Sequence, residues 1–452
     1  MNADSVFCCG RTMKADLQTI ALGVVSRLLD AGHAAFFAGG CVRDMLRGVT
    51  PHDYDVATSA TPEQVQGLFP QTYAVGAHFG VVVVHEDGWD LEVATFRADG
   101  LYLDGRRPEG VTFSTPQQDA ERRDFTVNGM FYDPIQGEVI DFVGGRADLE
   151  CKVLRAIGDP ASRFAEDKLR LLRAVRFAAT LHFDIEPATW EAVCRHAREI
   201  HMVSAERIRE ELVRIFVSPS RVRGFDLLDA SGLLREILPE VERLKGCEQP
   251  PQFHPEGDVF VHTRIMLDLL PPVVSVPLVF SVLLHDIGKP PTFAVDPTGR
   301  IRFNGHDQIG ARMAGEVMMR LKFSRAEIDA TVAAVENHMV FKDVKQMRPA
   351  KVRRFLARPH IEDELELHRV DCASSHGGLD NYDFLREQQA ALANEPVIPP
   401  PLVTGGDVLA LGWKPGPKIG EILEQVQTRQ LENGFANREE ALDWISREFP
   451  PQ

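Results

Sequence analysis

The sequence has few of the features that mark secreted, disulfide-bonded or membrane-spanning proteins. Its 452 residues contain only seven cysteines, which are scattered and form no CxxC pair. We therefore expect neither a disulfide framework nor a structural zinc site. No apolar run reaches the length that a membrane-spanning helix needs, and the first residues lack the basic and then apolar pattern of a signal peptide. These absences predict a cytoplasmic protein with no membrane partner.

The sequence also lacks an excess of positive charge. It carries 50 lysines and arginines against 66 aspartates and glutamates, which gives a formal net charge of −16. Nucleic-acid binding needs a local basic surface rather than a basic total, so this balance does not exclude an RNA-binding protein. Basic residues form local clusters at Arg106-Arg107, Arg122-Arg123, Arg170/Arg173/Arg176 and Lys342–Arg354. We expect an uneven distribution of charge over the surface.

The stretch Gly39–Thr58, GGCVRDMLRGVTPHDYDVAT, carries the most informative pattern in the chain. The apolar run Ala34–Ala38 leads directly into the glycine pair, as a buried strand leads into a tight turn. Glycines let the backbone approach a ligand that a Cβ would exclude. The short helix expected at Val42–Arg47 points its free N–H groups toward an anion. The segment therefore predicts a phosphate-binding turn that includes Gly40 and Arg43.

Asp53 and Asp55 follow this turn with one residue between them. Because residues i and i+2 of a strand share a face, we expect both carboxylates to project toward the same point. Two such carboxylates beside a phosphate-binding turn suit a pair of Mg²⁺ ions that catalyse in-line nucleotidyl transfer. The alternative is a turn followed by two solvated aspartates. Glu92 is left outside the predicted site, because an exposed glutamate on a strand is equally common.

Two strands are expected at Val81–Val84 and Asp90–Arg97, joined by a turn at Glu86–Gly88. The polar, glycine-containing segment Arg97–Thr115 is expected to be a mobile loop. The motif ERRDFTVNGM at Glu121–Met130 begins with paired arginines, for which a helix cap with ion pairs is the simpler interpretation.

The stretch Phe164–Phe177, FAEDKLRLLRAVRF, predicts a helix with one buried side. Along another side, Asp167, Arg170, Arg173 and Arg176 recur every three residues. An i,i+3 salt bridge on an amphipathic helix is the simpler interpretation. Cytosine and adenine, however, present an exocyclic amine beside an unprotonated ring nitrogen, which a carboxylate and a guanidinium match together. Uracil and guanine present a carbonyl and a protonated ring nitrogen, so an Asp–Arg pair would accept C and A and reject U and G.

A further group of histidines and aspartates lies in the second half of the chain. His285-Asp286 follows the apolar run Val276–Leu284, and the other members are His262, His306, His338 and Asp371. Histidine with carboxylate ligands suits Mg²⁺, Mn²⁺ or a transition metal and leaves positions open for phosphate and water. The alternative is a helical domain whose histidines belong to the core.

These motifs resemble those of the class II tRNA nucleotidyltransferase (CCA-adding enzyme) and bacterial poly(A) polymerase family, with a C-terminal HD domain. The resemblance rests on GGCVRD with DYD, on ERRDFTVNGM, on EDKLR, and on LLHDIGKP with the neighbouring histidine segments. It extends over nearly the whole chain from Met13, which is a candidate start. One departure is Gly129, where alanine is commoner in the family.

The resemblance implies an α+β fold. A small nucleotidyltransferase domain, similar to polymerase β, combines a mixed sheet with helices, and an all-helical neck and body and a helical HD domain follow it. A chain of this length suits several such units. The expected divisions are an unstructured segment at 1–12, the nucleotidyltransferase head at 13–150, the nucleotide-selecting and RNA-binding neck and body at 151–250, the HD domain at 251–390 and a tail at 391–452.

The resemblance also implies roles for single residues. The expected nucleotide-binding residues are Gly40, Arg43, Arg123, Asp167, Arg170, Arg173 and Arg176. The expected metal ligands are Asp53 and Asp55 for Mg²⁺, and His262, His285, Asp286, His306, His338 and Asp371 for Mg²⁺, Mn²⁺ or Ni²⁺. The loop at Arg97–Thr115 corresponds to a flexible loop that helps to switch the family's site from CTP to ATP.

The expected activity is template-independent addition of C, C and A, from CTP and ATP, to the 3′ end of tRNA, with an accessory phosphohydrolase in the HD domain. No protein partner is implied. Three alternatives share these motifs in part: an A-adding enzyme, a poly(A) polymerase, and an HD phosphohydrolase whose first domain only tethers RNA. A non-catalytic RNA-binding protein is a fourth, which the intact metal ligands disfavour.

Overall fold

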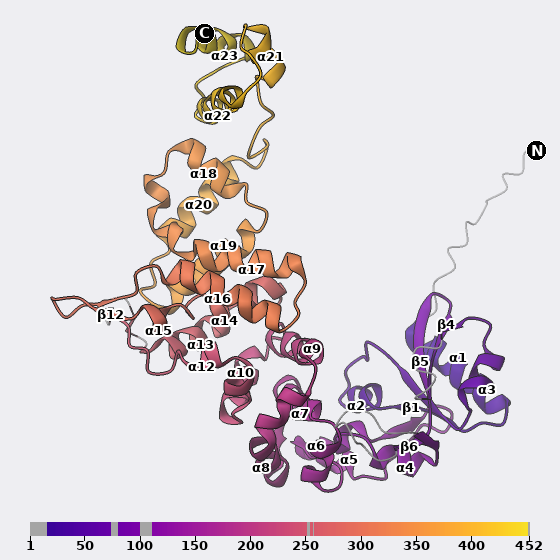
Figure 1. Ribbon diagram of the computed structural model, residues 1–452. Coiled ribbons are helices and arrows are strands. Elements are labelled where there is room, and N and C mark those ends of the chain that lie inside the picture. Colours follow the sequence, from indigo (N-terminus) through magenta and orange to yellow (C-terminus); the bar gives the residue numbers. More distant parts are fainter. Residues whose placement is uncertain (1–15, 74–79, 100–110, 251–253, 256, 451–452) are drawn as a thin grey trace, which may run out of the picture. The chain divides into compact units, whose positions relative to one another are not determined.

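The computed structural model describes residues 16–73, 80–99, 111–250, 254–255 and 257–450, and the chain divides into two compact units (Figure 1). The first unit consists of the described residues of Met1–Ile215 together with Arg223–Ile237. The second consists of Phe216–Val222 together with the described residues of Leu238–Gln452. The finer division that the sequence suggests, at 150, 250 and 390, stays a prediction. Within the described part of the chain, no helix combines the length and the apolarity that crossing a bilayer requires.

The first unit contains a mixed β-sheet, which confirms the α+β fold expected from the sequence. Among the described residues, seven strands form the sheet in the order β3-β4-β5-β2-β1-β8-β9. Their bounds are β1 Ala35–Ala38, β2 Asp55–Thr58, β3 Thr72–Tyr73, β4 Val81–Glu86, β5 Trp89–Thr95, β8 Phe131–Asp133 and β9 Glu138–Ile140. Strands β2 and β5 run parallel, and the other neighbouring pairs run antiparallel.

Two further strand pairs stand outside this sheet in the first unit. They are β6 Arg97–Asp99 with β7 Val111–Phe113, and β10 Val153–Leu154 with β11 Asp184–Ile185. The hairpin expected between Val81 and Arg97 is confirmed, because β4 and β5 pair with Glu86 opposite Trp89. Its turn residues, Asp87 and Gly88, both have positive φ (49° and 80°), as the tight turns of two-residue hairpins require.

Helices accompany the sheet and continue the first unit beyond it. Their bounds are α1 Leu17–Asp30, α2 Gly40–Leu46, α3 Pro62–Leu68, α4 Pro116–Glu121, α5 Gly145–Cys151, α6 Pro160–Glu166, α7 Leu169–Leu181, α8 Pro187–His196, α9 Ala205–Phe216, α10 Arg221–Ala230 and α11 Leu233–Ile237, with 3₁₀ turns η2 Thr126–Asn128 and η3 Ala197–Met202. Helix α1 begins where the Asp16 carboxylate accepts a hydrogen bond from the Thr19 N–H. The buried residues of α1 recur at helical spacing and are Ile20, Ala21, Val24, Val25 and Leu28.

Two local expectations from the sequence are wrong. The stretch Phe164–Phe177 is not one helix, because α6 ends at Glu166 and α7 begins at Leu169. Asp167 between them is extended (φ −142°, ψ 107°), and its side chain accepts a hydrogen bond from the Leu169 N–H at 3.0 Å. This short side-chain bond competes with the helical backbone pattern. In addition, β2 begins only at Asp55, so Asp53 lies just before the strand.

The second unit is almost entirely helical. Its helices are α12 Pro239–Glu242, α13 Val259–Leu269, α14 Val276–Leu284, α15 Lys289–Thr292, α16 His306–Arg320, α17 Arg325–Asn337, α18 Pro349–Leu356, α19 Ile361–Ser374, α20 Asp380–Ala391, α21 Gly405–Ala410, α22 Pro417–Leu431 and α23 Arg438–Glu448, with the 3₁₀ segment η4 His338–Gln346 and a small hairpin of β12 Ala294–Val295 and β13 Ile301–Arg302. Helix α14 is apolar on almost every side, and its residues from Leu278 onward are buried.

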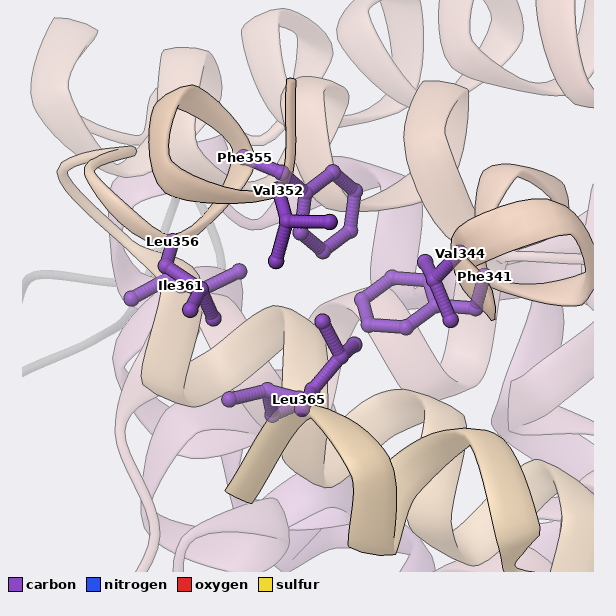
Figure 2. Close-up of a cluster of buried hydrophobic side chains, with 8 residues drawn as sticks. Phe341, Val344, Val352, Phe355, Leu356, Ile361 and Leu365 are labelled. Atoms are coloured by element: carbon purple, nitrogen blue, oxygen red, sulfur yellow. The ribbon is translucent and has the colours of Figure 1, made fainter. Parts of the chain in front are cut away.

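Two apolar clusters stabilise the later part of this unit. In the first, side chains from η4, α18 and α19 meet (Figure 2), and the rings of Phe341 and Phe355 pack edge to face with centroids 4.9 Å apart. In the second, α21, α22 and α23 enclose their own core around Val408, Ile422 and Ile445. The segment after Pro401 therefore has a packed core of its own and is more than an extended tail.

Candidate active sites

The first unit contains a cavity of about 660 Å³ that collects most of the residues singled out in its sequence. The glycine pair at the start of α2, the carboxylates of β2 and β5, and arginines of α7 and α9 all line it. Among the described residues, the arginines at the cavity are Arg43, Arg122, Arg123, Arg170, Arg173, Arg176, Arg207 and Arg214. The cavity is therefore suited to an anionic ligand.

Three carboxylates face this cavity at one place. Asp55 begins β2, Glu92 lies on the parallel neighbour β5, and Asp53 precedes β2 with the buried Tyr54 between the two aspartates. Burial, followed by the charges of Asp53 and Glu92, raises the pKa of Asp55 to about 6, against the opposing effect of Arg123. Oxygen ligands that repel one another in this way fit Mg²⁺.

Asp53 and Asp55 both line the cavity, although their spacing had predicted both on the strand and Asp53 lies before it. Glu92 is a residue that the sequence analysis left out. The sequence predicted that Glu92 lies on the strand Asp90–Arg97. It did not predict that β5 pairs in parallel with β2, which brings Glu92 next to Asp55.

The backbone and two arginines form the side of the cavity next to these carboxylates. Gly39 has φ of 74°, and a Cβ on it would lie only 2.9 Å from Nη1 of Arg123. Arg123 donates hydrogen bonds to the Asp119 carboxylate (3.0 and 3.2 Å) and to the Asn128 carbonyl (3.2 Å). Arg43 donates to the Asn128 side-chain oxygen at 2.6 Å and to the adjacent aspartate. Both guanidinium groups are thus held in fixed orientations by protein partners.

The two residues expected to select the base have different partners. Asp167 forms an ion pair with Arg207 of α9, with oxygen–nitrogen distances of 2.7 and 3.2 Å. Arg170 donates to the Glu166 carboxylate at 2.5 Å and to the backbone carbonyls of Arg163 and Arg122. The i,i+3 salt bridge considered for the sequence therefore does not describe Asp167, whose partner lies 40 residues away in the chain.

The next two arginines of the row contact buried carboxylates. Arg173 bonds Asp124 at 2.6 Å, and Arg176 bonds Glu211 at 2.6 Å. Although burial opposes the effect, Arg173 lowers the pKa of Asp124 to about 2. Both guanidinium groups also lie against the ring of Phe177, at 5.2 and 4.0 Å from its centroid. These contacts give Arg173 and Arg176 structural partners in addition to a place on the cavity.

The second unit brings together all six of its predicted metal ligands. His262 lies on α13, His285 and Asp286 follow α14, His306 begins α16, His338 begins η4, and Asp371 lies on α19. Two groups of ligand atoms are each within 4.8 Å of one another, and both contain Asp286. The groups are His262, His285 and Asp286, and Asp286, His306 and His338. His262 in addition contacts Asp371 at 3.1 Å. An adjoining cavity of about 430 Å³ gives access to Asp286 and Asp371.

Hydrogen bonds orient three of these histidines as metal ligands. The Nδ1 atoms of His285, His306 and His338 lie 2.9, 2.8 and 2.6 Å from backbone carbonyl oxygens, so each Nδ1 carries the proton. In the neutral rings the Nε2 atoms are left with lone pairs. The Nε2 atoms of His306 and His338 face one another at 3.2 Å, and burial lowers the pKa of His338 to about 4. Two facing lone pairs fit a shared cation.

Asp286 gives a second indication of a cation. Both of its carboxylate oxygens are buried, and Oδ1 has no hydrogen-bond partner, which is costly for a carboxylate oxygen unless a cation contacts it. One oxygen lies 3.0 Å from His285 and 2.6 Å from the buried Lys289, and the other lies 3.6 Å from His306. Lys289 is a residue that sequence reasoning missed, although it stands three positions after Asp286.

Comparisons with known proteins identify three domains along the chain. Residues 35–155 match the family described as "Poly A polymerase head domain", residues 182–245 that described as "Probable RNA and SrmB- binding site of polymerase A", and residues 262–372 the HD domain. The chain is 34% identical over 432 residues to the A-adding tRNA nucleotidyltransferase of Deinococcus radiodurans, covering 91% of this chain and 95% of that protein. It is 31% identical over 436 residues to the CCA-adding enzyme of Streptococcus mutans, covering 95% and 97%.

The fold is similar to that of a solved structure with a nucleotide. The crystal structure of the Bacillus stearothermophilus CCA-adding enzyme in complex with CTP superposes with a TM-score of 0.74 at 27% identity. The superposition covers 96% of this chain and 98% of that one. The similarity thus extends over both units.

Proposed function

The chain belongs to the class II tRNA nucleotidyltransferase and poly(A) polymerase family, and from this we propose that it adds C, C and A to the 3′ end of tRNA, using CTP and ATP without a template. The observation that carries the proposal is the single cavity that joins three carboxylates, a row of arginines and the Asp167–Arg170 segment. The five described cysteines are all free thiols, which suits the cytoplasm as the place of this activity.

Different residues of the cavity hold the metal ions and bind the phosphates. Asp53 and Asp55, with Glu92 beside them, hold Mg²⁺, which lowers the pKa of the RNA 3′ hydroxyl and neutralises triphosphate charge when it is bound. Arg123 and Arg43 donate hydrogen bonds to the phosphates, because each guanidinium has donors left beyond its protein partners. Gly39 and Gly40 keep the backbone clear for their approach.

Base selection rests on Asp167 and Arg170. The carboxylate accepts from the exocyclic amine of cytosine or adenine, and the guanidinium donates to the adjacent ring nitrogen. A uracil or guanine leaves both protein groups without partners, which costs several kcal/mol. Arg173 and Arg176 support this segment through their buried partners.

The test is nucleotide addition to two RNAs, a tRNA that ends at the discriminator base and a tRNA that ends in CC. We expect the protein to extend the first with labelled CTP and then ATP, and the second with ATP alone. Asp53→Ala and Asp55→Ala should each lower turnover by more than a thousandfold while tRNA still binds. Turnover of either variant within about tenfold of the wild type would overturn the assignment of the carboxylates.

The same experiment separates the closest alternative. The Deinococcus relative is named an A-adding enzyme and aligns over almost its whole length, so it supports an A-adding activity as the second candidate. Extension of only the CC-ending tRNA would establish that candidate. Repeated addition of A to RNAs that are not tRNA would instead indicate a poly(A) polymerase. Most of the loop on which a switch from CTP to ATP was predicted, Arg97–Thr115, lies outside the described residues.

For the second unit we propose metal-dependent hydrolysis of a phosphate ester at an RNA end. The histidines and aspartates of the site hold Mg²⁺, Mn²⁺ or Ni²⁺, which supplies a hydroxide nucleophile when it is bound. A 2′,3′-cyclic phosphate is a suitable substrate, because attack of water on the phosphorus with cleavage of the P–O3′ bond leaves a 2′-phosphate and frees the 3′ hydroxyl that nucleotide addition needs. Lys289 and the basic rim residues Arg302 and Lys342 line the cavity and favour a phosphate there.

Metal content tests this second proposal independently of activity. Protein loaded with Mn²⁺ or Ni²⁺ and dialysed should retain metal, and His285→Ala combined with Asp286→Ala should lose it. Because Asp286 belongs to both ligand groups, the double variant should lose every ion of this site, and the difference in metal content from the wild type shows whether the site holds one ion or two. Equal metal contents in the wild type and the double variant would make the histidines structural only.

A further inference from the structure

Arg207 lines the first cavity, and the proposed reaction gives its contacts no role. It belongs to α9 and lies at the cavity together with Asp167. Its two terminal nitrogens donate to the two carboxylate oxygens of Asp167, Nη2 to Oδ2 at 2.7 Å and Nη1 to Oδ1 at 3.2 Å. This paired geometry fixes both the position and the plane of the carboxylate, which a single hydrogen bond does not. The side chains of both residues are largely shielded from solvent, at 23% and 17% exposure.

The contacts of Asp167 leave one acceptor position for a ligand. A carboxylate offers about four lone-pair positions, two on each oxygen. Oδ1 accepts from the Leu169 N–H at 3.0 Å and from Arg207, so both of its positions are used. Oδ2 accepts only from Arg207 among the described hydrogen bonds. The exocyclic amine of a base therefore has one acceptor in this carboxylate, and Arg207 determines where it points.

Arg170 is oriented by a separate set of partners. It donates hydrogen bonds to the Glu166 carboxylate and to two backbone carbonyls. The Glu166 carboxylate also accepts a hydrogen bond from Arg163. The acceptor and the donor that face the base are therefore held independently, one by Arg207 and the other by Glu166. A change at Arg207 can release Asp167 without releasing Arg170.

We infer that Arg207 is a positioning residue for nucleotide selection, which holds the Asp167 carboxylate in the single orientation that accepts an exocyclic amine. The inference rests on the proposed role of Asp167. A carboxylate that is free to turn can also accept from the protonated ring nitrogen of uracil or guanine, and it then no longer rejects them. Arg207 thus acts on the choice of base through Asp167, without contacting the base itself.

The experiment measures kcat/KM for the correct and incorrect nucleotides on the full-length protein. The pairs are CTP against UTP with tRNA lacking CCA, and ATP against GTP with tRNA ending in CC. We expect Arg207→Ala to lower the ratio of correct to incorrect nucleotide at least tenfold. Arg207→Lys keeps the charge but not the two parallel bonds, so its ratio should be intermediate. Arg209→Ala, on the same helix but away from the cavity, is the matched control and should keep the wild-type ratio.

A double-mutant cycle with Asp167→Ala decides how Arg207 acts. If Arg207 works through Asp167, adding Arg207→Ala to the Asp167→Ala variant leaves the nucleotide ratio unchanged. Arg207→Ala that lowers kcat/KM for all four nucleotides by the same factor would overturn the inference. If Asp167→Ala alone leaves the ratio of correct to incorrect nucleotide unchanged, the proposed role of Asp167 is refuted instead. Failure of the inference about Arg207 and failure of the role of Asp167 are therefore distinguishable. Circular dichroism and thermal melting confirm that each variant is folded.

Discussion

At the scale of single residues, most charges of the first cavity are held by a fixed protein partner. Asp124 is the clearest case, because its side chain is 8% exposed and accepts from Arg173, from Asn128 and from the Phe125 N–H. A buried carboxylate with this many donors is stabilised in its charged form. The charge of Asp124 in turn fixes Arg173 at the edge of the cavity.

The lowered pKa of Asp124 makes a prediction for stability against pH. Its pKa is about 2 in the folded protein and 3.8 in the unfolded chain, so the unfolded chain binds the proton more readily. The stabilisation is complete above pH 4 and is lost as pH falls toward 2, and it amounts to about 2 kcal/mol. We expect Asp124→Asn to lower the free energy of unfolding in urea by at least this amount at pH 7.

The acid dependence and a control complete this test. The difference between wild type and Asp124→Asn should be constant from pH 7 to 5 and should shrink below pH 4. Asp184→Asn is the control, because that carboxylate is 93% exposed and its ion pair with Arg223 contributes little. A difference for Asp124→Asn that is the same at pH 3.5 and pH 7 would contradict the assignment.

At the scale of secondary-structure elements, α7 and α9 are joined by a buried ion pair. Arg176 of α7 bonds Glu211 of α9, and the two side chains are 12% and 3% exposed. Removing one partner of a buried pair leaves an uncompensated charge, so Arg176→Ala should cost about 3–5 kcal/mol. The helix that carries Glu211 also carries Arg207, so the loss should also relax nucleotide selection. Urea unfolding and the kcat/KM ratios measure the two effects.

Replacing both partners separates the charge from the packing. Arg176→Met combined with Glu211→Leu removes both charges and keeps an apolar contact, so most of the stability should return. If the double variant is as unstable as Arg176→Ala, then the packing of the two side chains, and not the unpaired carboxylate, is responsible.

Motifs within one short segment were predictable from the sequence, and partners far apart in the chain were not. The glycine pair and the two aspartates of Gly39–Thr58 follow from local spacing, and all four residues line one cavity. The break at Asp167 was missed because the arginine row continues through it with helical spacing. Arg207 was missed because it meets Asp167 only when α9 packs near α7.

Gly129 shows how packing explains a departure in sequence. The resemblance to the family implies an alanine at this position, yet a Cβ here would lie 2.7 Å from Cγ2 of Val143 and 3.0 Å from Cδ1 of Ile157. These neighbours fill the space that the missing methyl group leaves. The sequence shows that glycine replaces alanine at position 129, but only the structure shows that Val143 and Ile157 fill the space of the methyl group.

At the scale of the whole molecule, charge is distributed very unevenly. The chain as a whole carries a net charge of −16, yet eight arginines and six carboxylates line the first cavity among the described residues. A triphosphate with bound Mg²⁺ therefore meets a locally positive environment despite the acidic total. The acidic net charge of the chain is therefore compatible with a negatively charged nucleic-acid substrate. The sum of charges alone does not show this.

The two sites belong to different compact units, so their activities should be separable by mutation. Asp53→Ala disables addition and leaves the histidine site unchanged, and His285→Ala combined with Asp286→Ala does the reverse. The substrate that requires both is a tRNA lacking CCA whose 3′ end is blocked by a 2′,3′-cyclic phosphate. We expect the metal-loaded wild type to extend it with CTP after a lag, because hydrolysis must first expose the hydroxyl that attacks the nucleotide.

Mixing the two variants tests whether the hydrolysed RNA passes through solution. Neither variant alone should extend the blocked tRNA, whereas a mixture should, because the opened end is released by one protein and bound by the other. The control is the same tRNA with a free 3′ hydroxyl, which the His285/Asp286 variant should extend at the wild-type rate. Extension of the blocked tRNA by that variant alone would show that the histidine site is not needed. Failure of the wild type to extend it would exclude cleavage of the cyclic phosphate at its P–O3′ bond, while addition to free ends stands unaffected.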